Sequence, residues 1–419
     1  MEKGDLTTSF LWEQRRCAFR RDFPVMVKVV GPACNLDCDY CYYVEKEALY
    51  PGMRRDSWRM TLRTLELVVR DTIASQLGDK VTFIWHGGEP TLAGLDFFKE
   101  AVRLQRLYGE GKTVENVLQT NGTLIDERWA AFLAEENFLC GLSVDGPEFL
   151  HDAHRRYADG RGTWRRVVEC ARLFRRYGVG FNTMTTVNAT NARHPLAVYE
   201  AMRELGSRFM QFIPIVERVA DDEREVFSLV TPKYERSASV LLESVEAREW
   251  GNFLCRVFDV WVRRDVGVCY VNIFDNTLAG YVGEPQLCSM NARCTCSPAV
   301  EFNGDVYLCD HLVYPEYRLG NVLERSLAEM VKDDRQLAFE AEKEMSLPEK
   351  CRKCEFLRLC GGDCPKNRYA RDGEGVPLSS LCEGFRLFFT HTRRAFEFMA
   401  AELAAGRAPA NVMRCRDKF

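Results

Sequence analysis

Short apolar runs alternate with amphipathic segments through the first half of the chain. Each run is bounded by turn or polar residues, which is typical of buried parallel strands. The runs cover residues 25–31, 81–87, 114–120, 138–144, 179–187 and 209–216. Parallel strands have to be joined by crossover segments, which are usually helices, so the stretches between the runs should show helical patterns.

Amphipathic patterns between the runs predict helices. Thr61 is placed to cap one that stops at Gly78. Thr163 is placed to cap a second that stops at Gly178, and Pro195 opens a third. Six strand–helix units in succession imply an α/β fold with a parallel sheet and right-handed crossovers. Because a closed barrel of this type has eight units, we expect an open, partial (β/α)6 barrel.

The alternation ends near residue 217. Residues 252–264 predict another helix, and residues 384–404 predict a closing one. Between Cys288 and Cys382 the chain is rich in Cys, Gly and Pro and has little apolar core of its own, as in segments that fold around metal. We therefore expect a partial barrel over 1–225, a linker with a helix over 226–287, a cysteine-rich domain over 288–385, and a C-terminal helix and tail over 386–419.

Composition excludes several classes of protein. The 419 residues are 46% hydrophobic, which is enough for a substantial core, and 57 Lys and Arg against 61 Asp and Glu give a net charge of -4. A nucleic-acid-binding protein usually has a basic excess. The N-terminus lacks an apolar signal region, and no apolar run approaches the ~18 residues of a membrane span. We expect a soluble, cytoplasmic protein with neither nucleic acid nor membrane as a partner.

The 18 cysteines are the informative feature of the composition. In a long cytosolic chain they indicate metal ligation or catalysis rather than disulfides. Cys34, Cys38 and Cys41 form C-x3-C-x2-C directly after the first predicted strand. Three thiolates can bind three irons of a 4Fe–4S cluster and leave the fourth iron open to a substrate. A structural zinc site is the alternative, but it needs four ligands, and this loop has no fourth Cys or His.

This loop, with Tyr40 before its last cysteine, resembles that of the radical S-adenosylmethionine (SAM) superfamily, whose fold is a six-unit partial barrel. The segment WHGGEPTL (85–92) is similar to another superfamily motif. Gly88 allows close backbone approach, and Glu89 can accept from the ammonium group of SAM. The alternative interpretation of this segment is a glycine-rich turn.

The resemblance also extends to the ends of later strands, at QTNGTL (119–124) and SVDGP (143–147). It implies that Ser143 and Arg155 hold the carboxylate and ribose region of SAM and that Val216 lies beside its adenine. Ligands of parallel sheets bind at the carboxyl ends of the strands, which agrees with this placement. Ordinary turn and surface residues are the alternative for Ser143 and Arg155.

The later cysteines include CRKCEFLRLCGGDC, or C-x2-C-x5-C-x3-C. C-x2-C alone would suggest a zinc ribbon, but the whole pattern resembles the SPASM domain, which carries two fully ligated 4Fe–4S clusters. The resemblance implies one auxiliary cluster on Cys288, Cys294, Cys309 and Cys364, and another on Cys351, Cys354, Cys360 and Cys382. With the first motif this makes three clusters. Cys296 is unassigned and could compete with Cys294. For most of the seven remaining cysteines, including Cys17, we expect buried, inert thiols.

Segments across most of the chain, among them GLSVDGPEFLHDAHR and CGGDCPKNR, resemble anaerobic sulfatase-maturating enzymes. That family converts a Cys or Ser in a C/S-x-P-x-R motif of a sulfatase to Cα-formylglycine by means of a 5′-deoxyadenosyl radical. The resemblance implies that Asp310, after the third cysteine of the SPASM pattern, is the catalytic base. A surface-loop aspartate is the alternative. His86 departs from the pattern, because many members have Gln there.

The resemblance implies two partners, a sulfatase polypeptide in an unfolded or nascent state and an electron donor such as flavodoxin or ferredoxin. One alternative function is another SPASM-type peptide maturase, for example one that forms thioethers. Many of those carry an N-terminal peptide-binding domain, and the 24 residues before the first predicted strand are too few for one. A non-catalytic iron–sulfur carrier or a zinc scaffold is the alternative from another class, and the three-cysteine loop argues against both.

Overall fold

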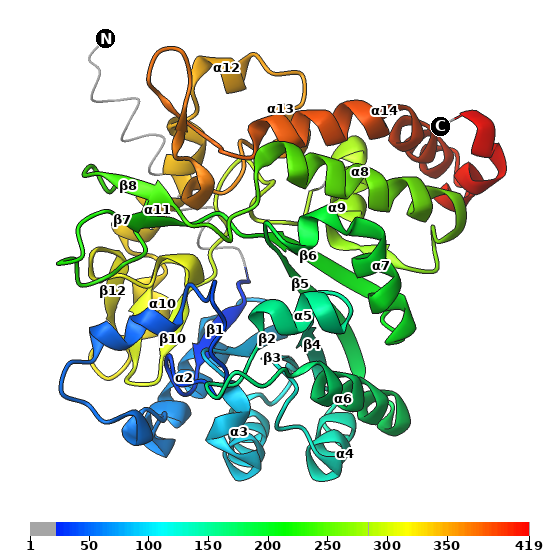
Figure 1. The fold of residues 1–419 in the computed structure, drawn as a ribbon. Helices are drawn as coiled ribbons and strands as arrows, with labels where there is room; N and C mark the ends of the chain where they lie inside the picture. Colours follow the sequence, from blue (N-terminus) through cyan, green and yellow to red (C-terminus); the bar gives the residue numbers. More distant parts are fainter. Residues whose placement is uncertain (1–21, 284, 419) are drawn as a thin grey trace.

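The centre of the computed structural model is a ten-stranded sheet, and the described residues are 22–283 and 285–418 (Figure 1). The strand order is β12-β11-β10-β1-β2-β3-β4-β5-β6-β9, and strands β1 to β6 are all parallel. These six strands confirm the predicted sheet and the open partial barrel. Their bounds are β1 Val25–Lys28, β2 Lys80–His86, β3 Thr113–Thr120, β4 Leu139–Ser143, β5 Gly180–Val187 and β6 Phe209–Pro214.

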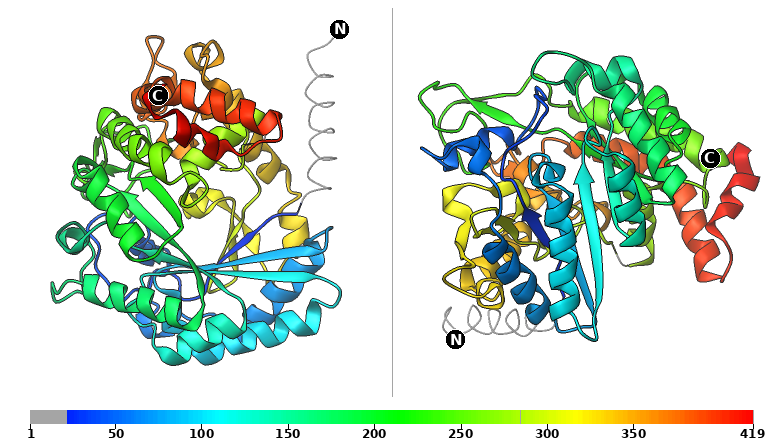
Figure 2. Two further views of the ribbon diagram at one scale, coloured as in Figure 1. Left: turned by 90° about the vertical axis from the view of Figure 1, so that its right-hand side faces the viewer. Right: turned by 90° about the horizontal axis from the view of Figure 1, so that it is seen from below.

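Helices follow each of these strands and lie along the outside of the curved sheet (Figures 1 and 2). Each buries its apolar side against the strands, as the amphipathic patterns predict. The helices are α2 Leu62–Ser75, α3 Leu95–Tyr108, α4 Glu127–Glu135, α5 Glu148–His154, α6 Trp164–Tyr177, α7 Pro195–Glu204 and α8 Ala247–Arg264. The loops that directly follow the carboxyl ends of the strands form the site.

The predicted helix caps are confirmed in one case and corrected in another. The side chain of Thr61 accepts from the backbone N–H of Thr64 at the start of α2. Thr163 precedes α6, but its hydroxyl donates to the carbonyl of Arg155 instead of capping. The carboxylate of Asp152 caps this helix, since it accepts from the N–H groups of Thr163 and Trp164, each at 2.8 Å. The prediction was wrong because a buried contact of the threonine outweighs its local preference.

A helical layer closes the far end of the sheet. It consists of α8, α9 (Asn272–Val282) and α14 (Cys382–Ala404), which lie together in Figure 1, and β9 (Tyr270–Val271) pairs with β6. Helices α8 and α14 pack closely where Gly251 meets Gly384. A Cβ added to Gly384 would lie 2.0 Å from the carbonyl oxygen of Ala247, so a larger residue would force the helices apart.

The cysteine-rich segment joins the barrel sheet. Strand β10 (Ala299–Glu301) pairs in parallel with β1, and β11 (Asp305–Tyr307) and β12 (Arg318–Asn321) continue the sheet in antiparallel fashion. Buried apolar residues of this segment, such as Val300 and Val306, belong to the same core cluster as the barrel strands. The segment therefore shares the core of the barrel.

Shorter elements complete the described fold. Strands β7 (Arg218–Ala220) and β8 (Ala238–Val240) form an antiparallel hairpin where the alternation ends. The remaining helices and strands are α10 Leu327–Met330, α11 Asp334–Met345, α12 Glu349–Arg352, α13 Leu357–Cys360, β13 Ala370–Arg371 and β14 Pro377–Leu378. Among the described residues, no helix combines the length and apolarity that crossing a bilayer requires.

Candidate active site and cysteine clusters

The loop that carries Cys34, Cys38 and Cys41, called the barrel loop below, follows β1 and is fastened to the end of β2. The N–H of Gly88 donates to the carbonyl of Gly31 at 2.8 Å, and that of Glu89 donates to Ala33 at 2.9 Å. A Cβ on Gly88 would lie 1.9 Å from the oxygen of Ala33, so only glycine allows this approach. The GGE segment thus positions the barrel loop.

The Glu89 carboxylate is buried beneath the barrel loop. Its Oε1 accepts from the N–H and hydroxyl of Thr91 and from the hydroxyl of Thr120. Its Oε2 accepts from the N–H of Asn121 at 2.7 Å. Burial raises the pKa of Glu89. Since Oε2 has a single partner within the described chain, it retains a lone pair for one more donor.

Side chains of the QTNGTL segment reach the barrel loop from the end of β3. The Asn121 amide donates to Asn35 Oδ1 at 2.9 Å and lies 3.9 Å from Cys34 Sγ, and the Asn35 amide donates to the Thr123 hydroxyl at 2.8 Å. The opposite end of the loop is held by Asp39, which pairs with Arg156. Both halves of the loop are therefore pinned by protein groups alone.

The three thiols of the barrel loop lie near one another and are each partly buried. Burial raises the pKa of Cys34 to about 12 and raises that of Cys38 further, and each thiol acts electrostatically on the others. Buried thiolates need a compensating cation. Three such thiols fit the corner irons of a cluster, which binds as a cation.

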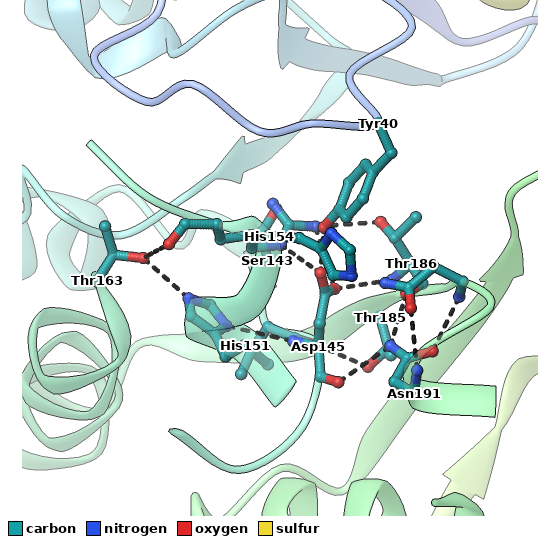
Figure 3. Close-up of polar contacts among 12 residues, drawn as sticks. Tyr40, Ser143, Asp145, His151, His154, Thr163, Thr185, Thr186 and Asn191 are labelled. Atoms are coloured by element: carbon teal, nitrogen blue, oxygen red, sulfur yellow. Dashed lines mark hydrogen bonds and ion pairs between the residues drawn. The ribbon is translucent and has the colours of Figure 1, made fainter. Parts of the chain in front are cut away.

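A buried ionic network lies beside the barrel loop (Figure 3). Arg155 donates to both oxygens of Asp145, at 2.9 and 3.2 Å, and to Thr186 at 3.1 Å. The hydroxyl of Tyr40 donates to the same carboxylate, and the guanidinium lies 5.6 Å from the Tyr40 ring centroid. Asp145 is fully buried, so the pair fixes both the arginine and the tyrosine that precedes Cys41.

Further polar contacts hold the backbone around Asp145 in place. His151 Nδ1 accepts from the N–H of Asp145 at 3.3 Å, so Nε2 carries the ring hydrogen and donates to the Thr163 hydroxyl at 2.9 Å. Burial lowers the pKa of His151 to about 3, which keeps the ring neutral. Ser143, at the end of β4, accepts from the Gln119 amide at 3.0 Å. Val216 is buried just beyond β6.

Asp310 belongs to the cysteine-rich segment and connects it to β1 and to the end of the barrel loop. Its Oδ1 forms an ion pair with Lys28 of β1, and its Oδ2 accepts from the Tyr42 hydroxyl at 3.0 Å. Lys28 is fully buried and also donates to His86 Nδ1 at 3.2 Å. Although burial acts in the opposite direction, Lys28 holds the pKa of Asp310 well below its usual range. The carboxylate is therefore ionised and held from two sides.

A second carboxylate, Glu301, faces the same lysine. Glu301 is the β10 partner of Lys28 across the strand pair, and it accepts from the hydroxyls of Tyr43 and Tyr50, the latter at 2.9 Å. Burial raises the pKa of Glu301 to about 7. Its environment differs from that of Asp310, which alone has direct contact with the ammonium of Lys28.

The remaining cysteines predicted as ligands separate into two groups in space. The first cysteine group is Cys288, Cys294, Cys309 and Cys364, whose thiols act electrostatically on one another. The second cysteine group is Cys351, Cys354, Cys360 and Cys382, which are coupled in the same way. These four line a cavity of about 300 Å³. The structure thus brings together the two interleaved sets that the resemblance implies.

Single-ion sites and clusters place different demands on the arrangement of thiols. Within residues 22–283 and 285–418, no three His, Cys, Asp or Glu side chains converge closely enough to hold one metal ion. A structural zinc site needs four ligands around one point, whereas a four-iron cluster takes each thiolate at a different corner.

Comparison with known proteins identifies the class. The sequence matches the Radical SAM superfamily over residues 29–202 and the SPASM iron–sulfur cluster-binding domain over residues 288–355. SuiB from Streptococcus suis, solved with its precursor peptide SuiA, has the same fold, with a TM-score of 0.58 at 15% identity over 88% of this chain and 80% of that chain. The protein is thus a radical SAM enzyme with a SPASM domain, and its cofactors are SAM and 4Fe–4S clusters.

Closer relatives define the family. The serine-type anaerobic sulfatase-maturating enzyme of Bacteroides thetaiotaomicron is 43% identical, over 94% of this chain and 95% of the relative. The cysteine-type enzyme of Clostridium perfringens is 33% identical, over 88% and 95%. Native anSMEcpe with bound AdoMet and Cp18Cys peptide superimposes with a TM-score of 0.78 at 32% identity, over 91% and 99%. The chain belongs to the anaerobic sulfatase-maturating enzymes.

Two residues of the site were missed by the sequence interpretation. Lys28 interrupts the apolar run VMVKVVG, and a charge inside a buried strand is a signal that could have found it. Asp145 was quoted within SVDGP without a role, yet it is the partner of Arg155. The contact of Lys28 with Asp310 joins residues far apart in the sequence, so only the fold reveals it, whereas Asp145 and Arg155 are ten residues apart.

Proposed function

We propose that this chain oxidises an active-site Cys or Ser of a sulfatase, within a C/S-x-P-x-R motif, to Cα-formylglycine. The observation that carries the proposal is the position of Asp310. An ionised, largely buried carboxylate contacts Tyr42, next to Cys41 of the barrel loop, and itself follows Cys309 of the first cysteine group. A base at that position would lie next to both the proposed SAM-binding cluster on the barrel loop and the proposed electron-accepting cluster on the first cysteine group.

The residues proposed to hold the cofactors follow from this arrangement. Cys34, Cys38 and Cys41 hold the cluster that binds SAM, and the first and second cysteine groups hold the auxiliary clusters. Around the SAM site we assign the six residues that border the barrel loop or end the neighbouring strands: Tyr40, Gly88, Glu89, Ser143, Arg155 and Val216. The free lone pair of Glu89 suits an ammonium donor, and the fixed guanidinium of Arg155 suits hydroxyl or carboxylate oxygens.

The chemistry divides between cofactor and protein. When bound, SAM and the clusters supply a 5′-deoxyadenosyl radical that removes a hydrogen atom from Cβ and the sink for the electron that the substrate gives up. Asp310 accepts the proton from the sulfur or oxygen of the target residue. Lys28 and Tyr42 keep its carboxylate ionised and oriented. The aldehyde forms directly from Ser, and by hydrolysis of a thioaldehyde from Cys.

The domain limits and partners are part of the same proposal. The proposed limits are a barrel domain over residues 1–225 and a two-cluster domain over 288–385, and the family matches at 29–202 and 288–355 lie within them. An unfolded or nascent sulfatase segment is the proposed substrate, since the site lies inside the barrel, and a flavodoxin or ferredoxin is the proposed electron donor. We place the enzyme in the cytoplasm, where a nascent chain is accessible.

Paired peptides test the function. The reconstituted enzyme is incubated anaerobically with SAM, a reductant and matched peptides that carry C-x-P-x-R or S-x-P-x-R, and the products are weighed by mass spectrometry. We expect formylglycine in at least one peptide and about 12 irons per chain if three four-iron clusters are present. Thioether formation would contradict the proposal in favour of another peptide maturase. A colourless, zinc-loaded protein would contradict the cluster assignment itself.

A further inference from the structure

A buried lysine lies against the first cysteine group. Lys343, on α11, is fully buried, and its ammonium donates to the backbone carbonyls of Cys288 at 2.6 Å and Ser289 at 2.8 Å. The carbonyl of Lys343 in turn accepts from Arg368 at 2.7 Å. These contacts fix the ammonium beside the first residue of the group and account for how a lysine is tolerated in this interior.

The ammonium of Lys343 makes its hydrogen bonds at the first cysteine group. Both acceptors are backbone carbonyls, those of the ligand residue Cys288 and of the adjacent Ser289. A lysine also lies beside the second group, but it differs in exposure. Lys350, which directly precedes Cys351, is exposed to solvent. Water and salt screen an exposed charge far more than a buried one.

Arg368 does not create the same asymmetry. It is buried, and its guanidinium donates to the carbonyls of Gly362 and Asp363, which lie between Cys360 of the second group and Cys364 of the first. A charge shared between two sites shifts both in the same direction. The first group also has the carboxylate of Asp310 next to Cys309, so Lys343 supplies the buried positive charge that opposes this carboxylate.

We propose that Lys343 is a positioning residue that raises the reduction potential of the cluster held by the first cysteine group relative to that of the second. This rests on the ligand assignment proposed above. A fixed positive charge in a poorly screened interior favours the reduced, more negative form of a nearby cluster. The first group includes Cys309, which adjoins Asp310, so Lys343 favours electron acceptance by the cluster nearest the proposed base.

Redox titration of the loaded full-length protein tests the inference. Cys34→Ala, Cys38→Ala and Cys41→Ala are combined so that only the two auxiliary clusters are loaded, and each is followed by electron paramagnetic resonance at poised potentials. In this background we compare Lys343→Gln, which keeps a donor but removes the charge, with Lys343→Arg, which keeps the charge. Lys350→Gln is the matched control, because it removes an exposed lysine beside the other group.

For Lys343→Gln we expect a shift of about tenfold toward the oxidised form of one cluster at fixed potential, which is ~59 mV for a one-electron couple. Lys343→Arg should retain the parental potentials, and Lys350→Gln should change either cluster by much less. Two unchanged potentials in a Lys343→Gln protein with about eight irons would overturn the inference and leave the ligand assignment intact. Loss of four irons from Lys343→Gln would also overturn it, because the lysine would then hold the cluster rather than tune it. Fewer than about eight irons in the parental background would contradict the ligand assignment instead.

Discussion

The barrel loop and the second cysteine group hold their thiols by different means. The three cysteines of the loop lie within residues 34–41, and hydrogen bonds from the ends of β2 and β3 fasten that short segment. The second cysteine group instead gathers Cys351 and Cys354 near α12, Cys360 at the end of α13 and Cys382 at the start of α14. Its thiols line a cavity of about 300 Å³.

This difference indicates where iron contributes to folding. Because protein groups pin the barrel loop, its shape needs no metal, and binding should be added to a preformed site. The second group surrounds a cavity whose lining includes Phe356, Phe385 and Phe389 but whose four thiols come from separate segments, so a bound cluster would join α12, α13 and α14. Metal binding is then part of the folding free energy of that region.

The largest expected effect comes from the barrel loop. Cys34→Ala, Cys38→Ala or Cys41→Ala should abolish SAM cleavage, because the cluster loses one of its three thiolates. Because protein groups hold the barrel loop in shape, each variant should stay soluble and lose only about four irons. The 5′-deoxyadenosine product is measured by chromatography and iron by colorimetric assay.

Cys415→Ala is the control for this experiment, since Cys415 belongs to none of the three groups. It should cleave SAM at the parental rate and keep its iron. Full 5′-deoxyadenosine production by a Cys38→Ala protein would refute the role of the barrel loop. Aggregation of all three loop variants would contradict the view that the loop is preformed.

Asp310 contacts Tyr42, next to the barrel loop, and its substitution separates proton transfer from radical chemistry. Asp310→Asn keeps the shape but accepts no proton at neutral pH. SAM cleavage should persist, because the barrel loop is unchanged, while formylglycine formation should fall by about 10²–10⁴. Both products are measured in one reaction, by chromatography and by mass spectrometry.

Asp305→Asn is the matched control, because Asp305 lies on the same hairpin but pairs with Arg318 rather than with the barrel. It should form aldehyde at close to the parental rate. Aldehyde formation by Asp310→Asn at that rate would show that the base lies elsewhere. Loss of both products, with iron intact, would show instead that Asp310 supports the bound SAM.

The barrel loop and the sheet could be predicted from the sequence. A site made of neighbouring residues can be recognised from the spacing of those residues alone. C-x3-C-x2-C after a strand identified the barrel loop, and the apolar runs predicted the six parallel strands that the structure contains. The grouping of Cys364 with Cys288 could not be derived from spacing, since it depends on how distant segments pack. It came from the family resemblance alone.

Other features lay outside the reach of any local pattern. Strands β10 and β11 are three residues each, too short for a periodic signal, and they extend the barrel sheet because β1 offers an open edge. Lys343 lies on a helix rich in charged residues, so nothing in the pattern separates it from its exposed neighbours Glu342 and Glu344. Tertiary packing alone buries it.

A smaller loss is expected in the second cysteine group. Cys351→Ala or Cys382→Ala should remove about four of ~12 irons and lower solubility, since the region folds with its cluster. Iron content and the soluble fraction after anaerobic expression are the measurements. Cys255→Ala, which changes a cysteine of α8 outside the groups, should keep both. Unchanged iron in Cys351→Ala or Cys382→Ala would show that the residue is not a ligand.

The smallest expected effect concerns the contact between α8 and α14, the helix that begins at Cys382. His391 of α14 lies 2.7 Å from Asp259 of α8, and the hydrogen bond to this carboxylate raises the pKa of His391 despite the opposing charge of Arg263. A raised pKa in the folded state stabilises the protein fully below the unfolded pKa of about 6.5 and no longer once the pH exceeds the folded pKa. Because both side chains are more than a quarter exposed, we expect only about 0.2–1 kcal/mol.

His391→Gln should therefore lower the thermal midpoint of the iron-loaded protein by about 1–2 °C at pH 5.5 and leave it unchanged at pH 9. Asp259→Asn should reproduce this pH dependence, because it removes the same pair from the other helix. His194→Gln is the control, since His194 lies at the start of α7, away from the α8–α14 contact. An equal loss at both pH values would mean that His391 stabilises the helix pair by packing rather than by charge. The link between α14 and α8 would then depend on the close Gly251–Gly384 contact and its apolar neighbours, and protonation would have no part in holding Cys382 in place.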